Sequence, residues 1–153
     1  MPDENSVRTV NAAARPFAAP ARIATSRDRL AGDIRKLLDE VWPVLRGEGV
    51  RTGHNIVVYF PGPAGSFSIE AGVETFSEFT GSGAVQPAST PSGEVATIAH
   101  YGEYSKLGDA YAALERWCAD HDRRPAGINW EVYGDWDDDP AKVRTDVYFL
   151  LAD

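Results

Sequence analysis

The residue most suggestive of chemistry is Glu131, an acidic residue within the Trp-Glu-Val-Tyr segment that ends at Tyr133. The β-forming residues around it predict a strand over residues 128–133, and side chains alternate between the two faces of a strand. Glu131 therefore shares a face with Asn129 and Tyr133. A carboxylate beside aromatic rings suits an organic cation or a planar aromatic compound, through charge attraction and cation–π contact. If buried, it could also act as a general base. The alternative is that Glu131 lies on an exposed strand face and has no function.

An earlier segment of the sequence matches this one. Residues 53–59 align without a gap with residues 127–133, and the Gly, Asn, Val and Tyr positions are identical. Tyr59 thus corresponds to Tyr133, whereas Val57 stands where the later segment has Glu131. If the two halves form one sheet or two facing sheets, the faces with Asn and Tyr meet across a cleft, and the apolar faces pack on helices. These apolar residues are Ile56, Val58, Phe60, Ile128, Trp130 and Val132.

The rest of the hydrophobic pattern predicts the elements that position these strands. Apolar residues recur twice at helical spacing, and β-forming runs predict strands before and after each helix. The two helical faces are Leu30, Ile34, Leu37, Leu38, Val41, Trp42 and Leu45, and then Leu107, Ala110, Tyr111, Leu114, Trp117 and Cys118. Strands are expected at about residues 17–25, 56–60, 66–70, 95–100, 128–133 and 145–151. This order predicts an α+β fold made of two β-α-β-β units in tandem.

The same pattern predicts the domain organisation. Residues 1–16 are rich in Ala, Pro and small polar residues, and we expect them to form a mobile N-terminal arm. Residues 17–153 are expected to form one domain. Within it, the first repeat covers about residues 17–79, a linker with Gly and Pro covers residues 80–93, and the second repeat covers about residues 94–152.

Composition and charge limit the classes of function. The formal net charge of −8 repels phosphate backbones, which argues against direct binding of nucleic acid. Cys118 is the only cysteine, so the chain forms no internal disulfide and suits a reducing compartment. No stretch approaches the ~20 consecutive apolar residues of a membrane-spanning helix, and the N-terminus lacks the pattern of a secretory signal. We therefore expect a cytoplasmic protein that does not enter membranes.

Metal and cofactor sites find no support in the sequence. The aspartate-rich turn that starts at Asp135 has the spacing of a calcium-binding loop, but Pro140 stands where that loop needs Gly. Cys118 and His121 lie three residues apart, without the two further ligands that a structural zinc site requires. No phosphate-cradling loop or dinucleotide-binding motif is present. We expect no metal and no cofactor.

Three parts of the second half carry a resemblance to a known family. They are the turn and helix start at 100–107, the Trp-Glu-Val-Tyr strand, and the ending Thr-Asp-Val-Tyr-Phe-Leu at 145–150. The first is similar to a Gly-x-Tyr turn into a second helix and the next to a Trp-Glu-x-Tyr strand. These are features of the GyrI-like family, the effector-binding domain of AraC-type and MerR-type transcription activators. The resemblance is good over residues 95–151 and extends to residues 17–79.

The resemblance implies a fold and a site. The fold is a pseudo-two-fold pair of β-α-β-β units, with antiparallel sheets, helices on one face and a central groove for hydrophobic, often cationic compounds. The strand glutamate, Glu131 here, is expected to face the ligand. Some stand-alone members are hydrolases that open the cyclopropane ring of DNA-alkylating natural products, with this glutamate helping to activate water. The chain departs from the regulators, because only about 16 residues lie outside the domain, too few for a DNA-reading module.

Three hypotheses for the function follow. The first is a stand-alone protein that binds an aromatic or cationic hydrophobic small molecule, in which Glu131 supplies charge while Tyr59, Tyr133, Tyr104 and Trp130 supply walls or hydrogen bonds. Trp130 faces away from Glu131 unless a β-bulge intervenes. The second is a hydrolase in the same groove, with Glu131 as the general base. The third is a modulator that contacts a basic protein partner through its acidic surface.

Overall fold

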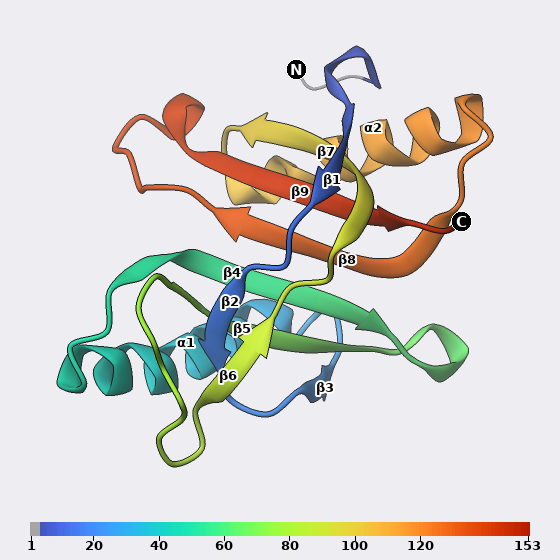
Figure 1. The fold of residues 1–153 in the computed structure, drawn as a ribbon. Coiled ribbons are helices and arrows are strands. Elements are labelled where there is room, and N and C mark those ends of the chain that lie inside the picture. Colours follow the sequence, from blue (N-terminus) through green and yellow to red (C-terminus); the bar gives the residue numbers. More distant parts are fainter. Residues whose placement is uncertain (1–3) are drawn as a thin grey trace. The chain divides into compact units, whose positions relative to one another are not determined.

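In a computed structural model that describes residues 4–153, the chain divides into two units (Figure 1). The C-terminal unit comprises Pro91–Asp153 together with the N-terminal segment that ends at Ala13, and the middle unit comprises Ala14–Thr90. Each unit contains a helix followed by two long strands that pair antiparallel. The α+β class predicted from the sequence is therefore confirmed.

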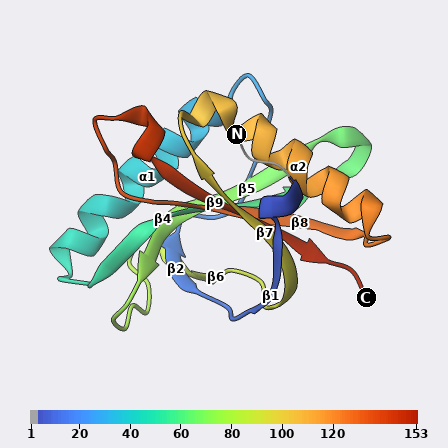
Figure 2. The same ribbon diagram turned by 90° about the horizontal axis from the view of Figure 1, so that it is seen from above.

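The C-terminal unit has an antiparallel sheet with the strand order β1-β7-β9-β8. Helix α2 lies across one face of this sheet (Figure 2). The elements of the unit are η1 (Glu4–Ser6), β1 (Arg8–Ala12), β7 (Gly93–Tyr101), η3 (Tyr104–Lys106), α2 (Leu107–Asp120), β8 (Pro125–Tyr133), η4 (Pro140–Lys142) and β9 (Arg144–Leu151).

The core of the C-terminal unit lies between α2 and the sheet. The predicted helical face is confirmed, because Ala110, Leu114 and Cys118 are buried and Leu107, Tyr111 and Trp117 pack against them. The sheet contributes every second residue of two strands, as the alternation of side chains requires. These strand residues are Ala96 and Ile98 on β7, and Val147, Phe149 and Leu151 on β9.

The middle unit has the strand order β4-β5-β2-β6, with β3 pairing to β5. Helix α1 packs on this sheet through Val41 and Leu45, which join Ala18, Val73 and Val85 in one buried cluster. The elements are β2 (Pro16–Ala19), β3 (Ile23–Thr25), α1 (Leu30–Gly47), β4 (Thr52–Pro61), η2 (Pro63–Gly65), β5 (Phe67–Thr75) and β6 (Gln86–Ser89).

Two predictions about connecting segments need correction. Five residues of the predicted N-terminal arm, Arg8–Ala12, form β1 and pair with β7, while residues 1–3 lie outside the described residues. The predicted linker at 80–93 contains β6, whose Gln86–Ser89 pairs with β2. Both are edge strands, and low hydrophobicity concealed them because an edge strand can be stabilised by backbone hydrogen bonds while its side chains stay exposed.

The prediction that the most apolar strand face packs on the helix is wrong for both units. On β8, Glu131 lies directly opposite Val147, a residue of the α2 core, so Asn129, Glu131 and Tyr133 face α2. On β4, the Asn55 side chain accepts a hydrogen bond from the Trp42 indole of α1 at 3.2 Å. The helices therefore cover the faces that carry Asn and Tyr.

Gly72 on β5 makes the middle sheet possible, because a Cβ atom there would lie 1.8 Å from the carbonyl oxygen of Ala18 on β2. We expect Gly72→Ala to lower the free energy of unfolding by about 1–3 kcal/mol through this backbone clash. Gly32→Ala, in an exposed part of α1 with nothing within 4 Å, should instead raise it by about 0.5–1 kcal/mol. Urea unfolding of both variants tests this, and a Gly72→Ala protein as stable as the parent would refute the close approach.

Burial raises the pKa of the Cys118 thiol. A raised pKa leaves less thiolate at mildly alkaline pH, and thiolate is the reactive form. We expect the native protein to resist a thiol-specific chromogenic reagent at pH 8, and the same protein in denaturant to react at once with one equivalent. Rapid labelling of the native protein would show that the packing of α2 on the sheet does not bury this residue.

Candidate functional site

Glu131 is buried, with 3% of its surface exposed. It lies on β8 in the C-terminal unit, on the face that α2 covers, in a row with Val147 of β9 and Ile98 of β7. The alternative interpretation placed Glu131 on an exposed strand face, and that placement is wrong. A buried carboxylate is costly unless hydrogen-bond donors surround it, so its neighbours matter.

Both carboxylate oxygens of Glu131 accept hydrogen bonds from tyrosines. The Tyr111 hydroxyl of α2 donates to Oε2, and the Tyr133 hydroxyl of β8 donates to Oε1. The Asn129 amide in turn donates to the Tyr111 hydroxyl oxygen at 3.3 Å. One helix and one strand face thus hold the carboxylate in a fixed orientation, through bonds that are strong when the carboxylate is ionised.

The local sequence explains how these groups meet. Residues 129, 131 and 133 alternate onto one face of β8, where the register with β9 is regular from Asn129 onward. Tyr111 lies one turn after Leu107 on α2, on the side that faces the sheet. Its ring packs against Phe149 with a centroid distance of 5.7 Å, which directs the hydroxyl toward β8.

Tyr104 connects this cluster to the surface. It lies in η3, just before α2, and its ring meets the Tyr133 ring edge-on with a centroid distance of 5.6 Å and an interplanar angle of 89°. Tyr104 is 45% exposed and Tyr133 is partly exposed, while Glu131 is buried. Tyr133 therefore contacts both the exposed Tyr104 ring and the buried carboxylate, within one unit.

Trp130 is not brought to Glu131. The irregularity in the pairing of β8 lies between Pro125 and Asn129, before Trp130, so no bulge turns this side chain toward its neighbour. Trp130 is buried on the other face, where it stacks on Tyr148 with a centroid distance of 5.3 Å. Its predicted role as a wall beside the carboxylate is not supported.

Tyr59 belongs to the middle unit, where its ring lies 6.3 Å from that of Phe67. Its role in ligand binding stays a prediction. Val57, which aligns with Glu131 in the sequence, is fully buried and brings no charge to the α1 side of β4. Only the C-terminal unit places a carboxylate at this position of the aligned strands.

Sequence reasoning missed the role of Tyr111 by assigning it to the helix core. The ring does pack in the core, but the hydroxyl reaches Glu131. A signal was present, because a tyrosine on a buried helix face needs a partner for its hydroxyl, and the facing strand carries a carboxylate.

The described residues hold no cluster of three or more potential metal ligands. In the aspartate-rich turn, whose spacing is that of a calcium-binding loop, two carboxylates accept hydrogen bonds from the backbone of the turn itself. Asp137 accepts from the backbone N–H of Asp139 at 2.8 Å, and Asp139 accepts from that of Ala141 at 3.1 Å. Over residues 4–153, no helix combines the length and the apolar character needed to cross a membrane.

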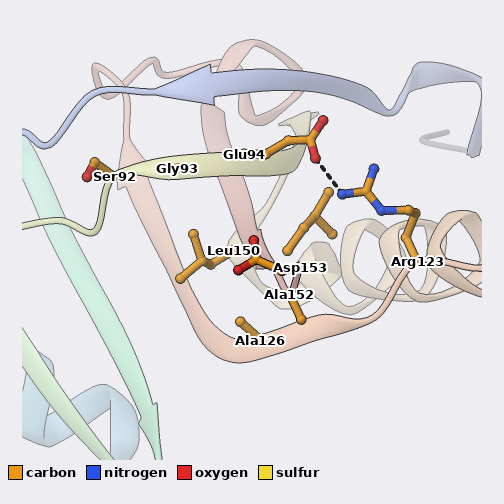
Figure 3. A pocket seen from close by; sticks show the side chains of 9 residues that line it. Ser92, Gly93, Glu94, Arg123, Ala126, Leu150, Ala152 and Asp153 are labelled. Carbon is orange, nitrogen blue, oxygen red and sulfur yellow. Dashed lines mark hydrogen bonds and ion pairs between the residues drawn. The ribbon is translucent and has the colours of Figure 1, made fainter.

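A surface pocket of about 400 Å³ lies in the same unit, where β7 begins and β9 ends (Figure 3). An ion pair between Arg123 and Glu94 borders it, and its lining contains no aromatic ring. The lining residues are Ser92, Gly93, Glu94, Arg123, Ala126, Leu150, Leu151, Ala152 and Asp153. Because none of the predicted site residues reaches this pocket, we place the candidate site at Glu131 instead.

Three proteins of known structure share the fold. The C-terminal domain of EcmrR matches with a TM-score of 0.71 and 16% identity, over 95% of this chain and 96% of the domain. SAV2435 bound to tetraphenylphosphonium matches with a TM-score of 0.72 and 11% identity, over 95% of this chain and 93% of that protein. A hydrolase from Listeria innocua matches with a TM-score of 0.62 and 10% identity, over 99% of this chain and 94% of that protein.

At these identities the similarity shows the fold alone. The EcmrR chain in a complex with DNA matches with a TM-score of 0.77 and 15% identity. The match covers 95% of this chain and 56% of the EcmrR chain. No curated protein sequence matches this chain significantly. The sequence does match a family of small-molecule-binding domains over residues 30–152, which is most of its length. The chain therefore belongs to the GyrI-like small molecule binding domain family.

Proposed function

We propose that this protein binds an aromatic or cationic hydrophobic compound, with the charge of the ligand directed at Glu131. The observation that carries the proposal is the buried Glu131 carboxylate, held by the hydroxyls of Tyr111 and Tyr133. A carboxylate oriented in this way attracts a cation strongly, because little water screens the interaction.

The surrounding rings support the same class of ligand. Aromatic faces attract organic cations by their quadrupole and pack against planar groups. Tyr104 offers such a surface near the outside, and Tyr133 follows it toward the carboxylate. The net charge of −8 adds a long-range attraction for cations and argues against binding nucleic acid directly.

The comparisons support this proposal at the level of the family. The family is one of small-molecule-binding domains, and SAV2435, which shares the fold, is seen bound to the organic cation tetraphenylphosphonium. The single cysteine is a free, buried thiol, which is consistent with a reducing compartment, so the cytoplasm is the location we propose.

Removing the charge of Glu131 tests the proposal. We expect Glu131→Gln to weaken binding of tetraphenylphosphonium at least about tenfold, because a neutral amide loses the attraction between charges at nearly the same size. Isothermal titration calorimetry measures the affinity, and thermal unfolding checks that the variant folds.

Glu94→Gln is the matched control, since it makes the same change of net charge at the exposed ion pair beside the pocket of Figure 3. We expect its affinity to equal that of the parent. If Glu94→Gln weakened binding and Glu131→Gln did not, the cation would occupy the surface pocket and the proposal would be wrong.

The ring of Tyr104, rather than its hydroxyl, should contribute to binding. We expect Tyr104→Ala to weaken tetraphenylphosphonium binding about two- to fivefold, the usual size of a cation–π contact at a partly exposed site. Tyr104→Phe keeps the ring and should bind like the parent. Equal affinities for the alanine and phenylalanine variants would remove Tyr104 from the site.

A hydrolase in the same site is the second candidate, favoured by the two tyrosine hydroxyls on the carboxylate. Glu131 would take a proton from water, the water oxygen would bond to a carbon of a strained cyclopropane ring, and a tyrosine would help protonate the carbon released as the ring bond breaks. Similarity of fold to a Listeria innocua hydrolase is compatible with this.

Incubation with a cyclopropane-bearing alkylating compound, followed by mass spectrometry, decides between binding and turnover. A hydrolase yields a product heavier by one water, at a rate that Glu131→Gln reduces at least about a hundredfold, as expected for loss of a general base. Recovery of the compound unchanged, at a protein concentration that binds it, would leave binding as the function.

A further inference from the structure

A second polar group lies beside Glu131, on the same face of the sheet. His100 of β7, Thr145 of β9 and Tyr133 of β8 form one row, because Thr145 pairs with both of the others. This row is next to the one that contains Glu131, since Tyr133 follows Glu131 by two residues. His100 is 2% exposed and Thr145 is 0% exposed, so both side chains are enclosed in the C-terminal unit.

Two atoms of this row have no hydrogen-bond partner among the residues that the structure describes. They are Nδ1 of His100 and Oγ1 of Thr145, and both are inaccessible to solvent. Buried polar atoms in folded proteins nearly always have a partner, either a protein group, a water molecule or a ligand. Two such atoms on directly paired residues point to one shared partner.

The chemistry of the two atoms specifies that partner. Nε2 of His100 lies 3.0 Å from the carbonyl oxygen of Glu103, which only accepts, so Nε2 carries the proton and Nδ1 of the neutral ring is an acceptor. The Thr145 hydroxyl can both donate and accept. A group that donates to His100 and accepts from Thr145 satisfies the ring nitrogen and the hydroxyl proton together, and a hydroxyl group does both. An ammonium could donate to both atoms but would leave the Thr145 proton without an acceptor, and a carboxylate cannot donate to His100.

We propose that His100 and Thr145 form a subsite for a hydroxyl group next to Glu131. An ordered water molecule bridges the two side chains in the ligand-free protein, and an alcohol or phenol group of a ligand replaces it. Rows on a strand face are two residues, or about 7 Å, apart. A ligand whose cation lies at Glu131 therefore reaches the subsite with a hydroxyl at the far end of one aromatic ring. The ligand half of this inference, in which a ligand hydroxyl binds at the subsite, rests on the proposed function. The water half, in which a water molecule bridges the two side chains, does not.

A crystal structure of the ligand-free protein tests the water half. We expect a water molecule at about 2.7–3.2 Å from both His100 Nδ1 and Thr145 Oγ1. In Thr145→Val, which has the same shape without the hydroxyl, this water should be displaced or disordered, while Thr145→Ser should retain it. A direct hydrogen bond between the two side chains, with no water between them, would overturn the subsite.

A matched pair of probes tests the ligand half. Tetraphenylphosphonium and its analogue with one para-hydroxyl group differ only in the group that the subsite recognises. We expect the parent and Thr145→Ser to bind the hydroxylated probe about three- to tenfold more tightly, the net effect of one hydrogen bond. Thr145→Val should bind both probes alike, with unchanged affinity for tetraphenylphosphonium.

The outcomes separate the two proposals. If neither probe binds but the bridging water is present, the proposed function is wrong and the subsite stands. If both probes bind through Glu131 with equal affinity in the parent and in Thr145→Val, the function stands and the hydroxyl subsite is wrong.

Discussion

The C-terminal unit depends on keeping one buried carboxylate hydrogen-bonded. Taking Glu131 out of water costs several kcal/mol unless donors replace the lost hydration. Tyr111 and Tyr133 supply those donors, one from α2 and one from β8, so the helix is joined to the sheet by a polar contact as well as by the hydrophobic core. The hydrogen bond from Tyr111 therefore both holds α2 on the sheet and orients the carboxylate of the candidate site.

This constraint divides the helix-facing surface of the sheet into two parts. Toward the end of α2, Cys118, Phe149 and Leu151 form an apolar core of the usual kind. Toward η3, the same face carries Glu131 and the row that includes His100 and Thr145. A polar group inside a protein is stable only when its hydrogen-bond partners are in place. Fewer arrangements of side chains are therefore stable at this end of the unit than at the apolar end.

The middle unit shows what the aligned segment becomes without that constraint. Its strand has the same Gly, Asn, Val and Tyr positions, but Val57 replaces the glutamate and is buried like its neighbours. Asn55 bonds to the Trp42 indole, so the polar contact between helix and strand survives without a charge. A similar order of helix and strands thus supports an ordinary core in one unit and a polar site in the other.

The sequence alone predicts the α+β class, both long helices, the long strands and the shared face of Asn129, Glu131 and Tyr133. These follow from local periodicity, which each segment carries in its own residues. It also singled out Glu131 and the family resemblance that the match over residues 30–152 supports.

The strand face that meets each helix is set by tertiary packing and could not be predicted from the sequence. Both faces of β8 are buried, Trp130 and Val132 on one and Glu131 on the other, so the more apolar face need not be the one that packs on the helix, and on β8 it is not. The pairing of His100 with Thr145 joins segments far apart in the sequence, and the Tyr111 hydroxyl finds its carboxylate only once α2 has packed. These are long-range contacts, set by how the elements pack together, and no local pattern encodes them.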